Sequence, residues 1–177
     1  MSSGARAARA APRLREQVLK IKIISMGDAK VGKSCLIKRY CEDKFIQKYI
    51  GTIGVDYGVK PLRLGSMEVR INMWDLAGGL DYVEIRNEFY KNTQGAVLVY
   101  DVTDRASFEG LDRWLDESAQ GGAKDAIIVV AATKCDLLAR TVTEEEGRKW
   151  AANRGFPFFE VSSHSGTRVA ALFTTML

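Results

Sequence analysis

Eight residues near the start of the chain have the types and spacing that suit polyphosphate binding. Gly27, Gly32, Lys33 and Ser34 fall in the pattern G-x-x-x-x-G-K-S, directly after an apolar run and before a helical pattern. In that context glycines let the backbone wrap around phosphates, while inward-pointing amides and a helix N-terminus favour negative charge. The lysine can reach the β- and γ-phosphates, and the serine hydroxyl can ligate Mg²⁺. The pattern predicts a nucleotide-polyphosphate site but does not identify the base.

Further motifs follow in order along the chain. They are YIGTIGVDY at 49–57, WDLAG at 74–78, TKCD at 133–136 and EVSS at 160–163. Together with the phosphate-binding motif, they make the chain resemble a small GTPase of the Ras superfamily, with the Rab branch most similar. The TIGVDYG segment, the EFYKNTQG run and the C-terminal portion resemble the Rab-like proteins that in some organisms carry a J domain after the GTP-binding domain. The resemblance covers residues 17–177.

The resemblance implies roles for individual residues at the phosphate end of the site. Mg²⁺ would be held by Ser34, by Thr52 and, through water, by Asp75, which is a set of hard oxygens. Thr52, in switch I, would also contact the γ-phosphate, as would the amide of Gly78 at the start of switch II. The resemblance places the catalytic positions at Lys33, Thr52 and Gly79.

The same resemblance implies a guanine pocket. Asp136 would accept from the guanine N1–H and exocyclic amine, a charge-assisted contact that adenine cannot make. Lys134 would lie along the base, Ser163 would offer its amide to the guanine O6, and Phe45 would pack against the guanine edge. His164 follows in the same loop, where packing is favoured over catalysis. The implied nucleotide contacts are Ala29, Lys30, Val31, Gly32, Lys33, Ser34, Cys35, Phe45, Thr52, Gly78, Thr133, Lys134, Asp136, Ser162, Ser163 and His164.

Several residues depart from the family pattern. Thr133 stands where the base motif begins with asparagine, which predicts weaker guanine binding rather than its loss. Gly79 stands where the family places the glutamine that orients the attacking water, which predicts very slow intrinsic hydrolysis. Ala29 and Lys30 replace P-loop glycines. Alanine is common among Rab proteins at the first position, whereas Lys30 is either a solvated side chain or a group that reaches the γ-phosphate or a partner.

These features predict a Rab-like, Mg²⁺-dependent molecular switch that binds GTP and GDP. The alternative is a GTP-held scaffold that rarely or never turns over. A switch II carboxylate, Asp81 or Glu84, could replace the missing glutamine, although its charge would repel the γ-phosphate. An ATP-using P-loop kinase or ATPase is disfavoured by Lys134 and Asp136 at guanine-reading spacing.

Protein partners are expected at the two switch regions. Ile53, together with the aromatic residues Tyr57, Trp74 and Phe89, corresponds to the surface with which Rab proteins meet effectors. An alternating strand with buried aromatic side chains would have the same letters, so both interpretations stay open. The resemblance also implies an exchange factor and an activating protein, and we expect a monomer.

The elements that position these residues follow from hydrophobic periodicity. The segment 18–26 is a short apolar-rich run, and the runs at 96–100 and 126–132 suit strands buried on both faces. Residues 68–73 alternate like a half-exposed strand, and 158–161 adds a short strand. Helical patterns cover 34–40 and the segments that start at Ser107, at the capping box Thr143–Glu146 and at Arg168. The pattern predicts a doubly wound α/β fold, and the resemblance implies a mostly parallel six-stranded sheet with helices on both faces.

Length and charge limit the domain organisation. The chain has 177 residues, of which 46% are apolar, and a net charge of +4, as is typical of one globular domain. Residues 1–16 hold four arginines against one glutamate, so most of the charge lies there and a nucleic-acid-binding domain is disfavoured. We expect a disordered basic arm at 1–16, with a short transit peptide as the alternative. A GTP-binding domain with a truncated last helix is expected at 17–177.

Cysteine usage and sequence motifs near the ends bear on location. The three cysteines and the single histidine lack metal-ligand spacing, which is typical of ordinary thiols in a reducing compartment. Ser2 excludes N-myristoylation, and no cysteine follows Cys135, so we expect this chain to have no lipid anchor. A cytoplasmic location is expected, with ciliary, flagellar or nuclear locations as alternatives.

Overall fold

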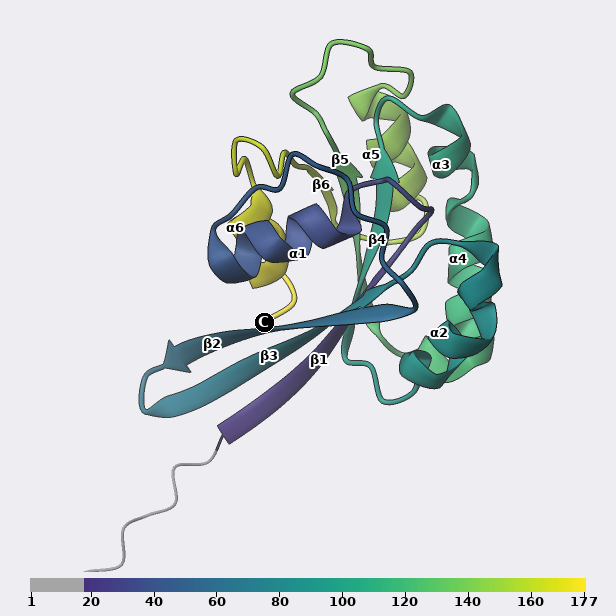
Figure 1. The fold of residues 1–177 in the computed structure, drawn as a ribbon. Coiled ribbons are helices and arrows are strands. Elements are labelled where there is room, and N and C mark those ends of the chain that lie inside the picture. The colour runs from purple at the N-terminus through teal and green to yellow at the C-terminus, as the bar shows by residue number, and fades with distance from the viewer. Residues whose placement is uncertain (1–17) are drawn as a thin grey trace, which may run out of the picture.

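A six-stranded sheet forms the centre of the molecule, in the order β2-β3-β1-β4-β5-β6 (Figure 1). The computed structural model describes residues 18–177, so the basic arm expected at 1–16 lies outside the described residues. Neighbouring strands pair in parallel, except that β2 and β3 are antiparallel. The strands are β1 (Val18–Met26), β2 (Val55–Leu64), β3 (Met67–Leu76), β4 (Gly95–Asp101), β5 (Ile127–Thr133) and β6 (Phe158–Glu160). This arrangement confirms the predicted mostly parallel, doubly wound α/β fold.

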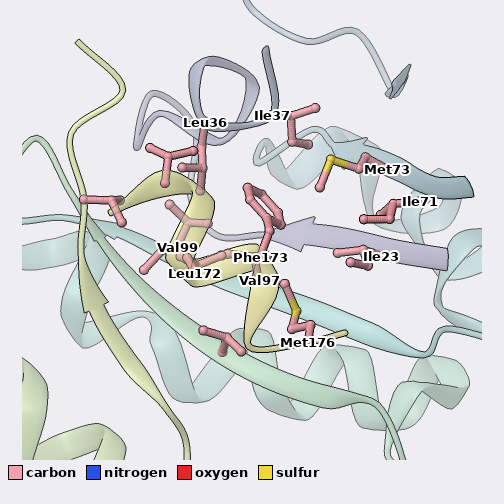
Figure 2. Packing of buried hydrophobic residues seen from close by; sticks show 14 of the residues in the cluster. Ile23, Leu36, Ile37, Ile71, Met73, Val97, Val99, Leu172, Phe173 and Met176 are labelled. Atoms are coloured by element: carbon pink, nitrogen blue, oxygen red, sulfur yellow. The ribbon is translucent and has the colours of Figure 1, made fainter. Parts of the chain in front are cut away.

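Helices cover both faces of the sheet (Figure 1). One face carries α1 (Lys33–Glu42) and α6 (Val169–Thr174), and the other carries α2 (Val83–Tyr90), α3 (Arg105–Glu109), α4 (Leu111–Ser118) and α5 (Glu144–Ala152). Figure 2 shows the first core, where Leu36 and Phe173 pack towards Ile71 and Val97 of the sheet. The sheet is therefore buried between two helical layers.

The predicted strand patterns correspond to the observed burial. Every residue of β4 is buried, as expected for a continuous apolar run in a central parallel strand. In β3, Val69, Ile71 and Met73 are buried while Arg70 is exposed, so the alternating run is indeed covered on one face. The capping box is also present, because Thr143 and Glu146 each bond to the other's backbone amide.

The strand β2 was not predicted from its residues. It contains Gly58 and Pro61, which normally argue against a strand because glycine is flexible and proline cannot donate to a ladder. Because β2 lies at the edge of the sheet and pairs only with β3, the missing donor of Pro61 is tolerated there.

The helical segment expected from Ser107 begins earlier and is divided in two. Asp104 caps α3, and its side chain accepts from the amide of Ala106 at 3.1 Å. Gly110 then separates α3 from α4. Ser107 itself is buried, and its hydroxyl accepts from the amide of Asp101 at 3.0 Å. Its role is therefore to join α3 to the end of β4 rather than to start a helix.

The strand polarity brings the sequence motifs together. Because β1, β3, β4, β5 and β6 run in the same direction, their carboxyl ends share one edge of the sheet, where ligands bind in open α/β folds. Each of the motifs at 27–34, 74–78, 133–136 and 160–163 lies at the end of such a strand. In the described part of the chain, no helix combines the length and the apolar character needed to cross a membrane.

Candidate nucleotide-binding site

A cleft of about 920 Å³ opens at this edge of the sheet. Each of the sequence motifs contributes residues to its walls, together with the segment 45–53 that leads into β2. Of the predicted site residues, those that line it are Ala29, Lys30, Gly32, Lys33, Ser34, Cys35, Phe45, Thr52, Ile53, Gly78, Gly79, Thr133, Lys134, Asp136, Ser163 and His164. Val31, Asp75 and Ser162 are buried and do not line the cleft.

The P-loop has the backbone geometry that its glycines predict. Gly27 has a φ of 142°, and a Cβ there would lie 2.2 Å from the carbonyl oxygen of Val99, so only glycine fits. Lys33 is 6% exposed, and its Nζ donates to the carbonyl oxygens of Gly27 and Asp28, both at 2.7 Å. Burial lowers the pKa of Lys33 to about 8, against the opposing effects of Asp75 and Asp28. A phosphate at this position would supply charge compensation for the buried ammonium.

Three oxygen-bearing side chains converge beside the P-loop. Ser34 Oγ lies 2.5 Å from Oδ2 of Asp75 and 3.0 Å from Oγ1 of Thr52, which is 3.2 Å from the same carboxylate oxygen. Octahedral Mg²⁺ binds oxygens at about 2.1 Å, which places neighbouring ligands about 3 Å apart. The hydroxyls of Ser34 and Thr52 have this spacing, and Asp75, expected to act through water, lies beside both. Ser25 on β1 donates to Oδ1 of Asp75 at 2.8 Å and orients the carboxylate. We did not predict Ser25, although it faces Asp75 in the register of β1 and β3.

Thr133 connects the base end of the cleft to the P-loop. Thr133 is 2% exposed, and its hydroxyl donates to the carbonyl oxygens of Val31 at 2.5 Å and Tyr100 at 2.9 Å. A hydroxyl has one proton, whereas the asparagine amide of the family pattern has two. Thr133 therefore retains the position of the link but can donate fully to only one carbonyl at a time.

Lys134 makes a second connection at the base end. Its Nζ donates to the carbonyl oxygen of Lys30 at 3.1 Å and pairs with Asp101 at 2.5 Å. Lys134 also lines the cleft, and its place beside a base stays a prediction. Asp136 lines the same cleft and is exposed, so its carboxylate is accessible to a ligand.

The opposite wall of the base pocket is held by an arginine. Phe45 and His164 meet edge to face, with ring centroids 5.1 Å apart. Arg39 on α1 donates from Nε to the carbonyl oxygen of Ser163 and from Nη2 to that of His164, both at 2.7 Å. These bonds fix the backbone of the loop after β6. Nothing in the sequence around Arg39 distinguishes it from an ordinary helix-surface arginine, so the sequence did not reveal this role.

The two glycines at the start of switch II, Gly78 and Gly79, differ in whether the backbone leaves room for a side chain. A Cβ on Gly78 would lie 2.3 Å from the backbone nitrogen of Ala29, so the close approach of two backbones demands glycine there. Gly79 has an extended backbone with φ −74° and ψ 149°. A Cβ on it would lie 3.4 Å from a ring carbon of Tyr82, which is ordinary contact. The fold therefore has room for a side chain at 79.

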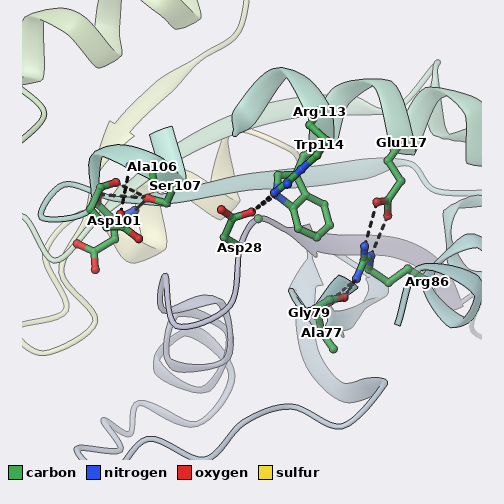
Figure 3. A network of polar contacts seen from close by, with 12 residues as sticks. Asp28, Ala77, Gly79, Arg86, Asp101, Ala106, Ser107, Arg113, Trp114 and Glu117 are labelled. Carbon is green, nitrogen blue, oxygen red and sulfur yellow. Dashed lines mark hydrogen bonds and ion pairs between the residues drawn. The ribbon is translucent and has the colours of Figure 1, made fainter. Parts of the chain in front are cut away.

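A buried arginine holds the backbone around these glycines (Figure 3). Arg86 is 1% exposed, and its Nη1 donates to the carbonyl oxygens of Ala77 at 2.8 Å and Gly79 at 2.5 Å. Its Nε and Nη2 pair with both carboxylate oxygens of Glu117 at 2.8 and 2.9 Å. Burial favours a higher pKa for Glu117, but hydrogen bonds from Arg86 and Tyr90 hold that pKa below its usual value. Sequence analysis missed Arg86, because no local pattern marks it.

Other charged residues near the phosphate end lie at the surface. Lys30 is exposed, has a φ of 68°, and places its Nζ 5.9 Å from the ring centroid of Tyr49 in switch I. Whether it reaches a γ-phosphate stays a prediction. Asp81 and Glu84 are exposed, and neither lines the cleft.

Three of the predicted effector residues form a row of aromatic rings, and the fourth, Ile53, is exposed. Ring centroids lie 4.6 Å apart between Tyr57 and Trp74 and 5.1 Å apart between Trp74 and Phe89. Tyr57 is 49% exposed and Ile53 is 83% exposed, so these side chains are accessible. Their role in binding effectors stays a prediction.

The fold and the cleft define a P-loop nucleotide-binding domain. The family model described as "Ras family" matches residues 22–177, and the chain belongs to that family. Ras-family GTPases bind guanine nucleotides and generally interact with effectors, exchange factors and activating proteins. The prediction of a small GTPase switch is thereby confirmed at the level of the family.

Within this family, the chain is similar to curated proteins that share one name. The chain is 48% identical over 173 residues to "DnaJ homolog subfamily C member 27" of Gallus gallus, covering 93% of this chain and 63% of the relative. Proteins of the same name from Homo sapiens and Danio rerio are 49% and 48% identical over 163 and 167 residues, covering 89% and 91% of this chain and 60% and 61% of the relatives. The chain thus spans about three-fifths of their length. These relatives confirm the predicted resemblance to Rab-like proteins with a J domain.

Proposed function

We propose that this chain is a Rab-like, Mg²⁺-dependent guanine-nucleotide switch with very slow intrinsic GTP hydrolysis. The proposal rests on one observation. The predicted phosphate-binding and base-reading residues line one cleft, and Gly79, which has no side chain, lines the same cleft. Lys33 would bind the β- and γ-phosphates, and Asp136 would accept from guanine. The convergence of these residues in one cleft supports the assignment of both roles.

The oxygens of Ser34 and Thr52 and, through water, the carboxylate of Asp75 would hold Mg²⁺. The 3.0 Å between the two hydroxyls suits neighbouring ligands of the ion, and Ser25 would keep the carboxylate oriented. When bound, the ion would neutralise charge on the phosphate oxygens. Thr52 is part of switch I, so its position would report whether a γ-phosphate is present.

Slow hydrolysis would follow from the side chains around Gly79. In phosphoryl transfer the protein acts by positioning and by stabilising charge, and the attacking water must be held in line. Gly79 offers only its backbone, and its carbonyl oxygen already accepts from the buried Arg86. The carboxylates Asp81 and Glu84 lie outside the cleft. Binding would therefore be retained while turnover is impaired.

The accessible aromatic surface supports a role in binding effector proteins. Trp74 is flanked by Tyr57 and Phe89, and Ile53, which follows Thr52 in switch I, is exposed. An exposed apolar patch of this kind is typical of protein interaction sites. An activating protein would have to supply a water-orienting group as well as an arginine.

Nucleotide extraction from the purified protein tests this function most simply. We expect guanine nucleotides in the extract and a much higher affinity for GDP than for ADP, measured by displacement of a fluorescent analogue. Recovered GDP would support a cycling switch. Recovered GTP would favour the alternative suggested by Gly79, a GTP-held scaffold. Recovery of ATP, or equal affinity for ADP, would contradict both.

A further inference from the structure

One face of α4 contacts both the P-loop and the start of switch II (Figure 3). Trp114 is 2% exposed, and its Nε1 donates to Oδ1 of Asp28 in the P-loop at 2.7 Å. Arg113 donates to the same oxygen at 2.7 Å. On the other side, the guanidinium of Arg86 lies 4.6 Å from the centroid of the Trp114 ring, and Glu117 pairs with that guanidinium. We call these five residues the α4 frame.

The α4 frame holds two backbone segments that touch each other. Arg86 fixes the carbonyls of Ala77 and Gly79, which flank Gly78. A Cβ on Gly78 would lie 2.3 Å from the carbonyl carbon of Asp28 and from the nitrogen of Ala29. The P-loop segment and the switch II segment are thus in direct contact. The indole of Trp114 contacts both sides, because it donates to Asp28 of the P-loop and packs against Arg86, which holds switch II.

Burial makes this arrangement stiff. Arg86 is 1% exposed, so moving the switch II backbone away would leave buried guanidinium donors without acceptors, which is costly. Its planar fork binds Glu117 through two bonds while its face stacks on Trp114, a combination that arginine can make and lysine cannot. The frame therefore restrains how far apart the two segments can lie.

We propose that Trp114 and Arg86 are positioning residues that set the affinity of this site for a third phosphate. The proposal rests on the proposed function, in which the amide of Gly78 meets the γ-phosphate of GTP. A diphosphate does not reach that amide, whereas a triphosphate needs the amide at a fixed distance from the P-loop. Loosening the frame should therefore weaken triphosphate binding and leave diphosphate binding unchanged.

The variant Trp114→Phe tests this because it keeps an aromatic ring and removes the indole N–H that reaches Asp28. We expect affinity for a non-hydrolysable GTP analogue to fall by about threefold to tenfold, the factor that one lost hydrogen bond represents. Affinity for GDP should change by less than about twofold, which is smaller than the effect of losing even a weak hydrogen bond. Trp150→Phe is the matched control, since Trp150 lies on α5 and does not line the cleft. Its ring centroid lies 4.0 Å from the guanidinium carbon of Arg154. It should change neither affinity.

A second variant shows whether the effect passes through the same contact. Asp28→Ala removes the acceptor, and its loss of triphosphate affinity should not add to that of Trp114→Phe. Unchanged GDP affinity in Trp114→Phe would also show that the fold is intact. Because Asp28 lies in the P-loop beside Lys33, the variant Asp28→Ala is judged by the ratio of its triphosphate to its diphosphate affinity. Equal weakening of both nucleotides, no change in either, or full additivity would overturn the inference. If the unaltered protein bound no guanine nucleotide, the proposed function itself would fail instead.

Discussion

The base end and the phosphate end of the cleft are built differently. At the base end, Thr133 and Lys134 bond to the backbone of other loops, and Arg39 fixes the loop after β6 through two carbonyls. At the phosphate end, Lys33 bonds to two P-loop carbonyls, but the predicted water-orienting position and part of switch I offer little. Gly79 has no side chain, and Tyr49 in switch I is 57% exposed.

This difference separates binding from turnover. Binding a nucleotide needs groups that are already in place, and buried hydrogen-bonded side chains provide them at low entropic cost. Turnover needs, in addition, a polar group that orients water at the γ-phosphate. In the proposed function, the base end fulfils the first need, and Gly79 would leave the second unmet. We therefore expect substitutions of the binding residues to cause large losses of nucleotide affinity. A glutamine at position 79 should raise the hydrolysis rate by a smaller factor and leave affinity unchanged.

The largest effect is expected at Asp136. Asp136→Asn replaces a charged acceptor with an amide that presents N–H groups to the two N–H donors of guanine. GDP binding should weaken by about 3–5 kcal/mol, since two hydrogen bonds to a charged group are lost and each is worth about 1.5–3 kcal/mol. Displacement of a fluorescent GDP analogue measures it, with Asp125→Asn, an exposed carboxylate outside the cleft, as the control. An unchanged affinity for GDP would contradict the assignment of the base end.

A somewhat smaller effect is expected at Ser34, where the metal would bind. Ser34→Asn removes the hydroxyl that lies within 3.0 Å of both Thr52 and Asp75. Mg²⁺ should slow nucleotide dissociation in the unaltered protein. In the variant, the factor by which Mg²⁺ slows dissociation should be about 10–100 times smaller, as for other disrupted metal sites. Dissociation rates with and without EDTA measure this. If the variant kept the same Mg²⁺ dependence for GTP and GDP, the proposed metal site would be wrong.

Thr133→Val tests how far the hydroxyl stabilises the base end. The change is nearly isosteric and leaves the carbonyls of Val31 and Tyr100 without their donor. The free energy of unfolding should fall by about 1–3 kcal/mol, the cost of an unsatisfied buried polar group. Urea unfolding measures it. Thr174→Val on the exposed face of α6 should change stability far less, and equal losses at both sites would refute the link.

Residues in local motifs could be predicted, whereas residues that act across the fold could not. The P-loop, the base motif and the central strands β4 and β5 are contiguous in sequence, so their types and spacing indicate their structure. Arg39, Arg86 and Trp114 act on backbone atoms or side chains that are distant in sequence, and no pattern records such pairs. The edge strand β2 was missed because Gly58 and Pro61 argue locally against a strand that β3 stabilises by pairing.

Position 79 provides the most direct test of the separation between binding and turnover. The measurement is single-turnover GTP hydrolysis by the unaltered protein and by Gly79→Gln, whose side chain the extended backbone and the 3.4 Å contact with Tyr82 can accommodate. We predict a rate at or below about 10⁻⁴ s⁻¹ for the unaltered protein, with unchanged GTP affinity in the variant. The glutamine should raise the rate about threefold to tenfold, the value of one added hydrogen bond. Hydrolysis by the unaltered protein as fast as that of an ordinary Ras protein, or no gain from glutamine, would contradict the account.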